Sequence, residues 1–166
     1  MRLMRQPIPT QKAFALFGTL LGTFPPAAIF LRFFGEAMTR PFFPVPVLLM
    51  LLCMNVICCL TGRYLGFKMS RMVSAVEHDS WSLMLFESLI IGFTWALGTG
   101  AAGGLLFFGI GAFFGAAFAI PVGVLAFALF VPLHRLLARG GMIDRRHLWP
   151  LACGVVMVIT ALILGM

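Results

Sequence analysis

The sequence predicts an all-α integral membrane protein: a bundle of five transmembrane helices with one short amphipathic helix at the membrane interface. Of its 166 residues, 61% are hydrophobic and only 10% are charged, whereas soluble domains carry about 25% charged residues. The mean hydropathy is +1.06. The stretch from Ser88 to Leu133 holds no charged side chain and is long enough to cross a bilayer twice. Together these features exclude a soluble domain, and we treat the chain as a single membrane domain over residues 1–166.

The first predicted span covers residues 13–34, after a basic segment at residues 1–12. A secretory signal peptide also begins with a basic segment before an apolar run, but no clear small-residue cleavage site ends this run. We therefore expect an uncleaved span. Pro25 and Pro26 lie inside it, and each proline removes a helical hydrogen bond and clashes with the carbonyl four residues earlier. A kink or break is expected near Thr23.

The second predicted span covers residues 45–64, and Pro46 suits its first turn. Asn55 lies near mid-depth, where a buried amide usually forms a hydrogen bond to a neighbouring helix. Residues 67–80 then alternate apolar and basic side chains at helical spacing, which favours a short amphipathic helix in the head-group region over a solvated loop. Trp81 marks the return into the bilayer.

The third and fourth predicted spans, residues 82–102 and 106–133, are joined by the glycine-rich stretch GTGAAGG at residues 98–104. Glycine adopts the left-handed backbone angles of a tight turn, so we expect a turn there. Residues 134–147 are basic and are expected to form a loop. The fifth span, residues 148–166, has 19 residues, or roughly 28 Å of helix, which just crosses the apolar layer.

The distribution of basic residues predicts the orientation. Only Arg32 and Arg40 fall on one side of the predicted spans, and the other lysines and arginines fall on the opposite side. Because cytoplasmic loops are enriched in lysine and arginine, the N-terminus is expected in the cytoplasm and the C-terminus outside. This fits a bacterial cytoplasmic (inner) membrane. The basic residues on the cytoplasmic side are Arg2, Arg5, Lys12, Arg63, Lys68, Arg71, Arg135, Arg139, Arg145 and Arg146.

Two rows of small residues, spaced four apart, follow the third and fourth spans. Such rows let helix backbones approach closely in lipid, where packing drives association. We expect a glycine-zipper hairpin in which the two spans cross in a right-handed sense at about −40°, or in which one end of each row is left free for another subunit or copy of the chain. The residues are Ser88, Gly92, Ala96, Gly100 and Gly104 in the third span, and Gly111, Gly115, Ala119 and Gly123 in the fourth.

Glu87 is the most informative single residue, because an ionisable group inside a span is costly and suggests an ion, proton or substrate site. With Asn55 and Thr94 it forms the candidate polar set. The alternative is structural: Glu87 lies close to the cytoplasmic side and could pair with Arg71 or Arg135.

No metal or catalytic pattern emerges. Glu77, His78 and Asp79 are consecutive, so on a helix they point in different directions and do not converge on one ion. His134 and His147 flank the basic segment, and neither has a second histidine at helical spacing inside a span. We find no nucleophile paired with a base, no HExxH helix and no phosphate loop. The chain is therefore expected not to be an enzyme, and the sequence indicates no cofactor.

One partial resemblance is to the eukaryotic copper transporters. Met50 and Met54, followed later by Gly111 and Gly115, resemble the MxxxM and GxxxG motifs of that family. The chain departs from it in having five spans and no leading segment rich in methionine and histidine. Methionine is also a common apolar filler, which is the interpretation we prefer.

Two functional classes remain. The first is a non-catalytic structural or accessory subunit of a membrane complex, with the lipid bilayer and other membrane subunits, or further copies of itself, as its partners. The alternative is a small transporter or channel that uses Glu87 as an ion or proton site. Nucleic acid is not an expected partner despite the net charge of +7, because the basic residues form short clusters between apolar runs.

Overall fold

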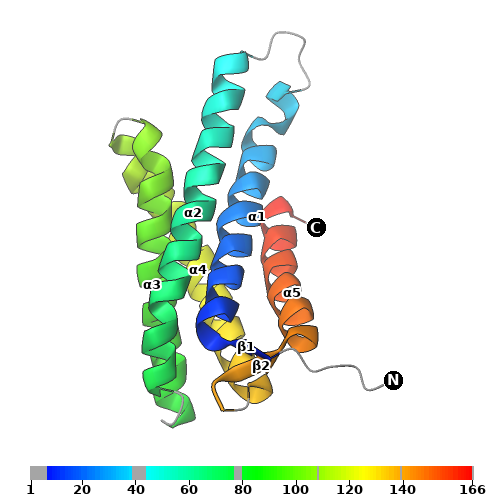
Figure 1. The fold of residues 1–166 in the computed structure, drawn as a ribbon. Coiled ribbons are helices and arrows are strands. Elements are labelled where there is room, and N and C mark those ends of the chain that lie inside the picture. Colours follow the sequence, from blue (N-terminus) through cyan, green and yellow to red (C-terminus); the bar gives the residue numbers. More distant parts are fainter. Residues whose placement is uncertain (1–6, 39–43, 77–79, 108, 139, 166) are drawn as a thin grey trace.

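The computed structural model describes residues 7–38, 44–76, 80–107, 109–138 and 140–165. Within them, five helices run along one another as a bundle (Figure 1), and all five are long and apolar enough to cross a membrane. This part of the predicted fold class is confirmed. The helices are α1 (Thr10–Met38), α2 (Val45–Val76), α3 (Trp81–Gly104), α4 (Ile110–Leu137) and α5 (Arg145–Leu164).

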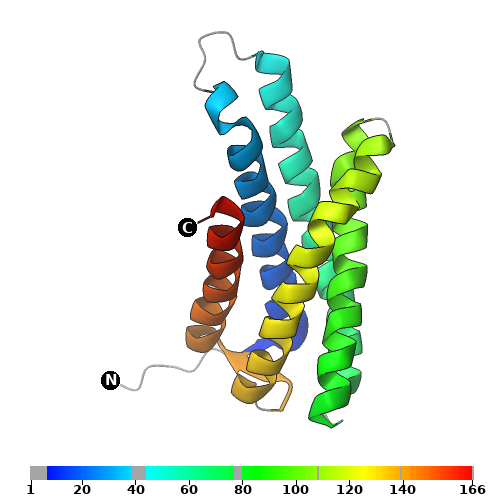
Figure 2. The same cartoon turned by 180° about the vertical axis from the view of Figure 1, so that it is seen from behind.

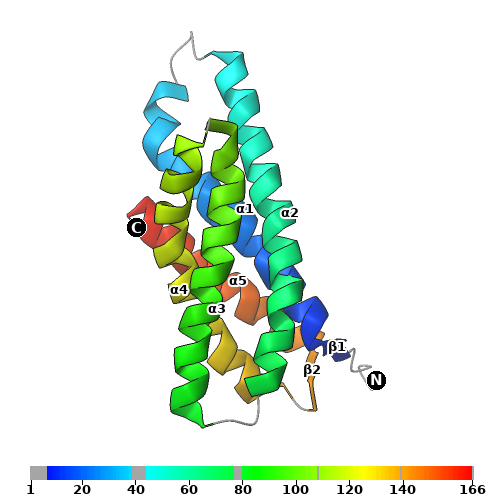
Figure 3. The same ribbon diagram turned by 90° about the vertical axis from the view of Figure 1, so that its left-hand side faces the viewer.

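The helices are arranged in a ring in the order α4, α3, α2, α1 and α5, with α5 packing back against α4. The most extensive contacts join α3 to α4 and α1 to α2. Figure 3 shows α2 and α3 side by side on one face, and Figure 2 shows α5 next to α1 and the C-terminal end of α4. Toward its N-terminal end α4 leans away from α1 and α5 (Figure 2). The ring is therefore closed at one end and wider at the other.

A two-stranded ribbon closes the narrow end, which we call the ribbon end. Strand β1 (Pro7–Pro9) pairs antiparallel with β2 (Met142–Asp144), with Ile8 opposite Ile143. Thr10 extends the link, because its amide and its hydroxyl both donate to the carbonyl of Gly141, at 3.2 and 3.0 Å. The ribbon ties the start of α1 to the start of α5, although these lie at opposite ends of the sequence.

The segment predicted as a basic loop, residues 134–147, is therefore largely ordered structure. Helix α4 continues to Leu137, β2 follows, and α5 begins at Arg145, earlier than predicted. Asp144 caps α5, since its side chain accepts from the amide of Arg146 at 3.2 Å. Gly140 and Gly141 have φ of +58° and +71°, left-handed angles that favour glycine.

The glycine-rich stretch at residues 98–104 forms the last turns of α3, so the predicted turn is displaced. The chain reverses instead through the short 3₁₀ helix η1 (Leu105–Phe107) and Gly109, whose φ is +78°. Glycines in a membrane helix permit close packing, and here that role prevails over turn formation.

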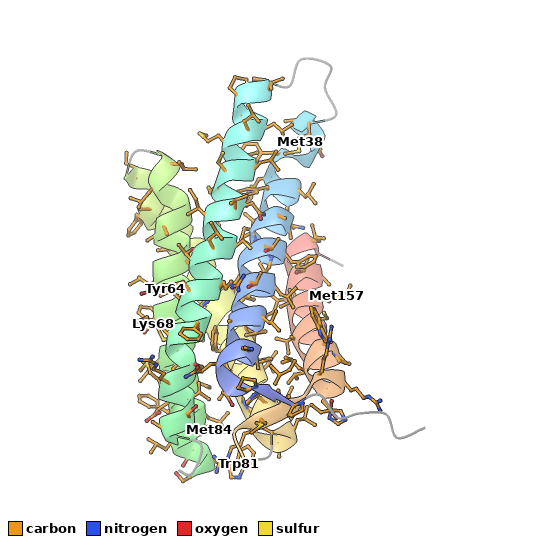
Figure 4. The ribbon with its side chains drawn as sticks, viewed as in Figure 1. Met38, Tyr64, Lys68, Trp81, Met84 and Met157 are labelled. Atoms are coloured by element: carbon orange, nitrogen blue, oxygen red, sulfur yellow. The ribbon has the colours of Figure 1, made fainter. Side chains whose placement is uncertain are left out.

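Two further segments differ from the expected spans. Helix α1 runs through Pro25 and Pro26 without a break as far as Met38, which lies at the end away from the ribbon (Figure 4). Helix α2 continues to Val76, so residues 67–76 extend the second span as one helix. Met69 and Val73 on this extension are buried against the bundle. Its position in the head-group region stays a prediction.

Aromatic packing fills the ribbon end. Phe17 of α1 stacks on Phe130 of α4, with ring centroids 3.8 Å apart, and Phe127 packs edge-on against Phe17 at 5.5 Å. Phe14 meets Phe130 edge-on at 5.2 Å. All four rings are fully buried.

Candidate functional site

The rows of small residues on α3 and α4 face each other along the seam between these helices. A Cβ added at Gly92 would lie 2.5 Å from the carbonyl oxygen of Gly123. Gly100 and Gly104 meet the backbone of Gly115 and Gly111 even more closely. On the same faces, Ser88 and Ala96 are fully buried, and Ala119 packs against Gly100. The surfaces expected to contact partner subunits are thus covered largely by the chain itself.

A second close seam joins α1 to α2. Gly18 and Gly22 of α1 lie against the backbone of Gly62 and of Cys58 in α2, with no space for a side chain. Gly66 completes the seam against Phe14. The four-residue spacing of Gly62 and Gly66 is the sequence signal that could have predicted this seam.

The three residues of the candidate polar set do not form one site. Asn55 of α2 donates to the carbonyl of Thr23 in α1 at 3.0 Å, a hydrogen bond between neighbouring helices of the kind expected for a buried asparagine. Thr94 lies on the exposed face of α3 and donates to its own helix, at the carbonyl of Ile90. Only Glu87 lines a pocket.

That pocket lies at the ribbon end and has a volume of about 10 Å³, about the space of one water molecule. Glu87, His134 and Arg135 share its wall with apolar neighbours. His134 is only 3% exposed and its Nε2 has no hydrogen-bond partner among the described residues. Its ring packs edge-on against Phe14 at 5.1 Å.

Arg135 is held at the mouth of this pocket by the start of α3. Its Cζ lies 4.9 Å from the ring centre of Trp81, and its Nη1 lies 3.4 Å from the sulfur of Met84. Figure 4 places Trp81 and Met84 at this end of the bundle. Of the two arginines considered as partners for Glu87, Arg135 is the one that shares its pocket. His134, which the sequence did not indicate as a ligand, lines the same pocket as Glu87. Only the tertiary structure shows that these two residues lie in one pocket.

No group of three or more His, Cys, Asp or Glu side chains gathers in a metal-binding arrangement within the part of the chain that the structure describes. Glu77, His78 and Asp79 lie outside the described residues. His147 is exposed in the first turn of α5.

An apolar cavity of about 830 Å³ lies at the wide end of the ring. Its walls come from residues 21–34 of α1, 54–58 of α2, 95–104 of α3 and 110–122 of α4, and it is partly open to the surroundings. Small-molecule sites typically measure about 300–1,000 Å³. Phe33 of α1 meets Phe118 of α4 edge-on at 5.9 Å, and both line the cavity. The sequence does not predict this cavity, because the cavity depends on how α4 tilts.

Comparison with protein-family models, with curated proteins and with solved structures gives no match for this chain.

Proposed function

We propose that this is a non-catalytic integral membrane protein that holds the apolar chain of a membrane lipid in the cavity between α1 and α4. The observation that carries the proposal is the cavity itself: about 830 Å³ with almost entirely apolar walls. The cavity is partly open to the surroundings, so an apolar chain can enter it and gain van der Waals contacts with its walls. In a bilayer, lipid chains occupy such a space.

The basic residues support an orientation with the ribbon end in the cytoplasm. The starts of α1, α3 and α5 and the ends of α2 and α4 all lie at that end (Figure 1). These termini carry Lys12, Arg71, Arg135 and Arg145, whereas Arg32 lies in the other half of α1. By the positive-inside rule the cavity then faces the outer leaflet, in keeping with a bacterial inner-membrane protein whose C-terminus is outside.

The test places the full chain in nanodiscs made with dibrominated phosphatidylcholine, whose acyl chains quench tryptophan. Trp95 lines the cavity but is only 2% exposed. With Trp81 and Trp149 changed to phenylalanine, Trp95 is the sole reporter. We expect strong quenching, and we expect the double variant Ile29→Phe with Val122→Phe to reduce it about twofold or more by filling the cavity.

The matched control is Val158→Phe on α5, where Val158 is 54% exposed and lies outside the cavity. It should leave the quenching unchanged. Equal quenching in the cavity-filled variant and the parent would refute the proposal, since the bromine atoms would then reach Trp95 by another route.

A second candidate is the accessory subunit expected from sequence, now with a different contact surface. In α2 only 17% of the most apolar window is buried inside the bundle. Large side chains such as Leu52, Val56 and Leu60 are more than half exposed there. A partner or a second copy would pack on this face of α2. Purification in a mild detergent followed by mass spectrometry should show a stable partner, and a lone monomer would count against this function.

The transporter hypothesis keeps one supporting observation, the placement of buried His134 beside Glu87. A Glu87→Gln variant in liposomes tests it. Unchanged ion or proton flux would remove Glu87 from any transport mechanism.

A further inference from the structure

We infer that Thr99 is the polar anchor of the cavity, and that the ligand is an uncharged lipid with a hydroxyl or carbonyl oxygen next to its apolar chain. This inference rests on the proposed function and specifies its ligand. The observation behind it is Thr99 itself: the residue is 3% exposed and lines the cavity, and its hydroxyl has no hydrogen-bond partner among the described residues.

The free hydroxyl of Thr99 is unusual for this chain. A threonine in a helix normally satisfies its hydroxyl by donating to the carbonyl three or four residues earlier. For Thr99 that group would be the carbonyl of Trp95, and this bond is not formed. In the described helices, the threonines that do donate to the carbonyl four residues earlier are Thr19, Thr23, Thr61, Thr94 and Thr160, at 2.6 to 2.9 Å.

A buried unpaired hydroxyl in an apolar site costs about 1–3 kcal/mol. A ligand oxygen that bonds to Thr99 removes this cost, whereas a pure hydrocarbon does not.

The surrounding contacts hold Thr99 in place. One turn before it, the indole Nε1 of Trp95 donates to the carbonyl of Gly62 in α2 at 3.0 Å. Cys58 of α2 contributes a weak bond, with its sulfur 3.8 Å from the carbonyl oxygen of Thr99. These two bonds fix this part of α3 against α2, so the anchor belongs to a rigid wall.

The lining also defines the charge of the ligand. None of the described residues that line the cavity carries a charge at neutral pH. A carboxylate or phosphate buried there would have no compensating cation among the described residues that line the cavity, and burying an unpaired charge is very costly. A neutral oxygen fits, and an anionic head group would have to remain outside.

The experiment compares three ligands of equal chain length, hexadecane, hexadecanol and hexadecanoate, by their ability to relieve the quenching of Trp95 by a brominated chain. We expect hexadecanol to bind about fivefold more tightly than hexadecane, equivalent to about 1 kcal/mol for one neutral hydrogen bond. Hexadecanoate should bind more weakly than the alcohol. In Thr99→Val, which removes only the hydroxyl at similar volume, the alcohol should fall to the level of the alkane.

Two variants serve as controls. Thr99→Ser keeps the hydroxyl and should keep the preference for the alcohol. Thr94→Val removes a hydroxyl that is already satisfied on the exposed face of α3, and should change nothing.

The possible outcomes distinguish a failure of the Thr99 anchor from a failure of the proposed lipid-binding function. If the alkane and the alcohol bind the unaltered protein equally well, or if Thr99→Val keeps the preference, the anchor is refuted while the apolar cavity stands. If neither compound relieves the quenching, both the proposed function and the anchor fail. The comparison of hexadecane with hexadecanol uses the unaltered protein. It can therefore refute the Thr99 anchor even if the Thr99→Val variant does not fold.

Discussion

The two ends of the bundle differ in how closely α1 and α4 pack against each other. At the ribbon end, α1 and α4 meet through stacked and edge-on aromatic rings, and the pocket that remains has a volume of about 10 Å³. At the wide end the same two helices separate around about 830 Å³, and Phe33 and Phe118 touch across the gap. In lipid the hydrophobic effect does not distinguish these arrangements, because acyl chains are as apolar as the side chains. Close side-chain packing is therefore expected to make the ribbon end the main source of stability. The cavity makes the wide end the expected place for the proposed lipid binding.

The largest expected effect tests this division directly. Phe17→Ala should lower the free energy of unfolding by about 3 kcal/mol, because Phe17 is fully buried and stacked on Phe130 and its loss leaves a cavity. Phe33→Ala at the wide end removes a side chain that is 63% exposed, and should cost far less. Reversible unfolding in detergent, followed by circular dichroism, measures both. Similar losses in the two variants would show that the ends do not differ in stability.

A smaller effect is expected where stability depends on backbone contact along the α3–α4 seam. A Cβ in Gly100→Ala would collide with the carbonyl of Gly115, and such overpacking typically costs about 1–3 kcal/mol. Gly154→Ala on α5 is the matched control, because nothing lies within 4 Å of its added Cβ. The control should gain up to about 1 kcal/mol from helix propensity. Opposite shifts in melting temperature would support a contribution of close backbone contact at the α3–α4 seam to stability. Shifts of the same sign would contradict it.

The smallest effect concerns the link between α3 and α2. Trp95→Phe keeps most of the buried ring but removes the bond from Nε1 to the carbonyl of Gly62. Hydrogen bonds between membrane helices average about 0.6 kcal/mol, so the loss of stability should be of that order. Slow exchange of the Gly66 amide, which is one turn away on α2, should persist in hydrogen-exchange mass spectrometry. A loss of several kcal/mol would mean that Trp95 supports the cavity by more than this bond.

The sequence predicted the helices and the α3–α4 seam because both depend on local signals. Apolar runs indicate spans, and small residues four apart indicate close approach, as Gly92 and Gly123 show. The glycines within residues 98–104 led to an incorrect prediction of the turn, because a glycine-rich stretch is equally consistent with a flexible connection and with a packing surface. The structure resolves this ambiguity through contacts made by α4.

Features that depend on tertiary geometry could not be predicted. The strands of the ribbon have three residues each, and β1 contains two prolines, so no strand periodicity is visible. His134 comes to lie beside Glu87 only through the crossing of α4 over α3. The cavity depends on the tilt of α4, and the free hydroxyl of Thr99 can be identified only once its neighbours are placed.

The ribbon has a consequence for how the protein is made. Strand β1 is synthesised near the start of the chain, but its partner β2 appears only after four helices have been completed. The two glycine-lined pairs, α1 with α2 and α3 with α4, can each form as soon as their second helix is synthesised, because each joins neighbours in the sequence. The ring itself can close only when residues 142–144 have paired with β1 and α5 has packed between α1 and α4. Ring closure is thus a late, long-range step in biogenesis, and a chain released before β2 would keep the aromatic contacts between α1 and α4 but would lack the ribbon and α5.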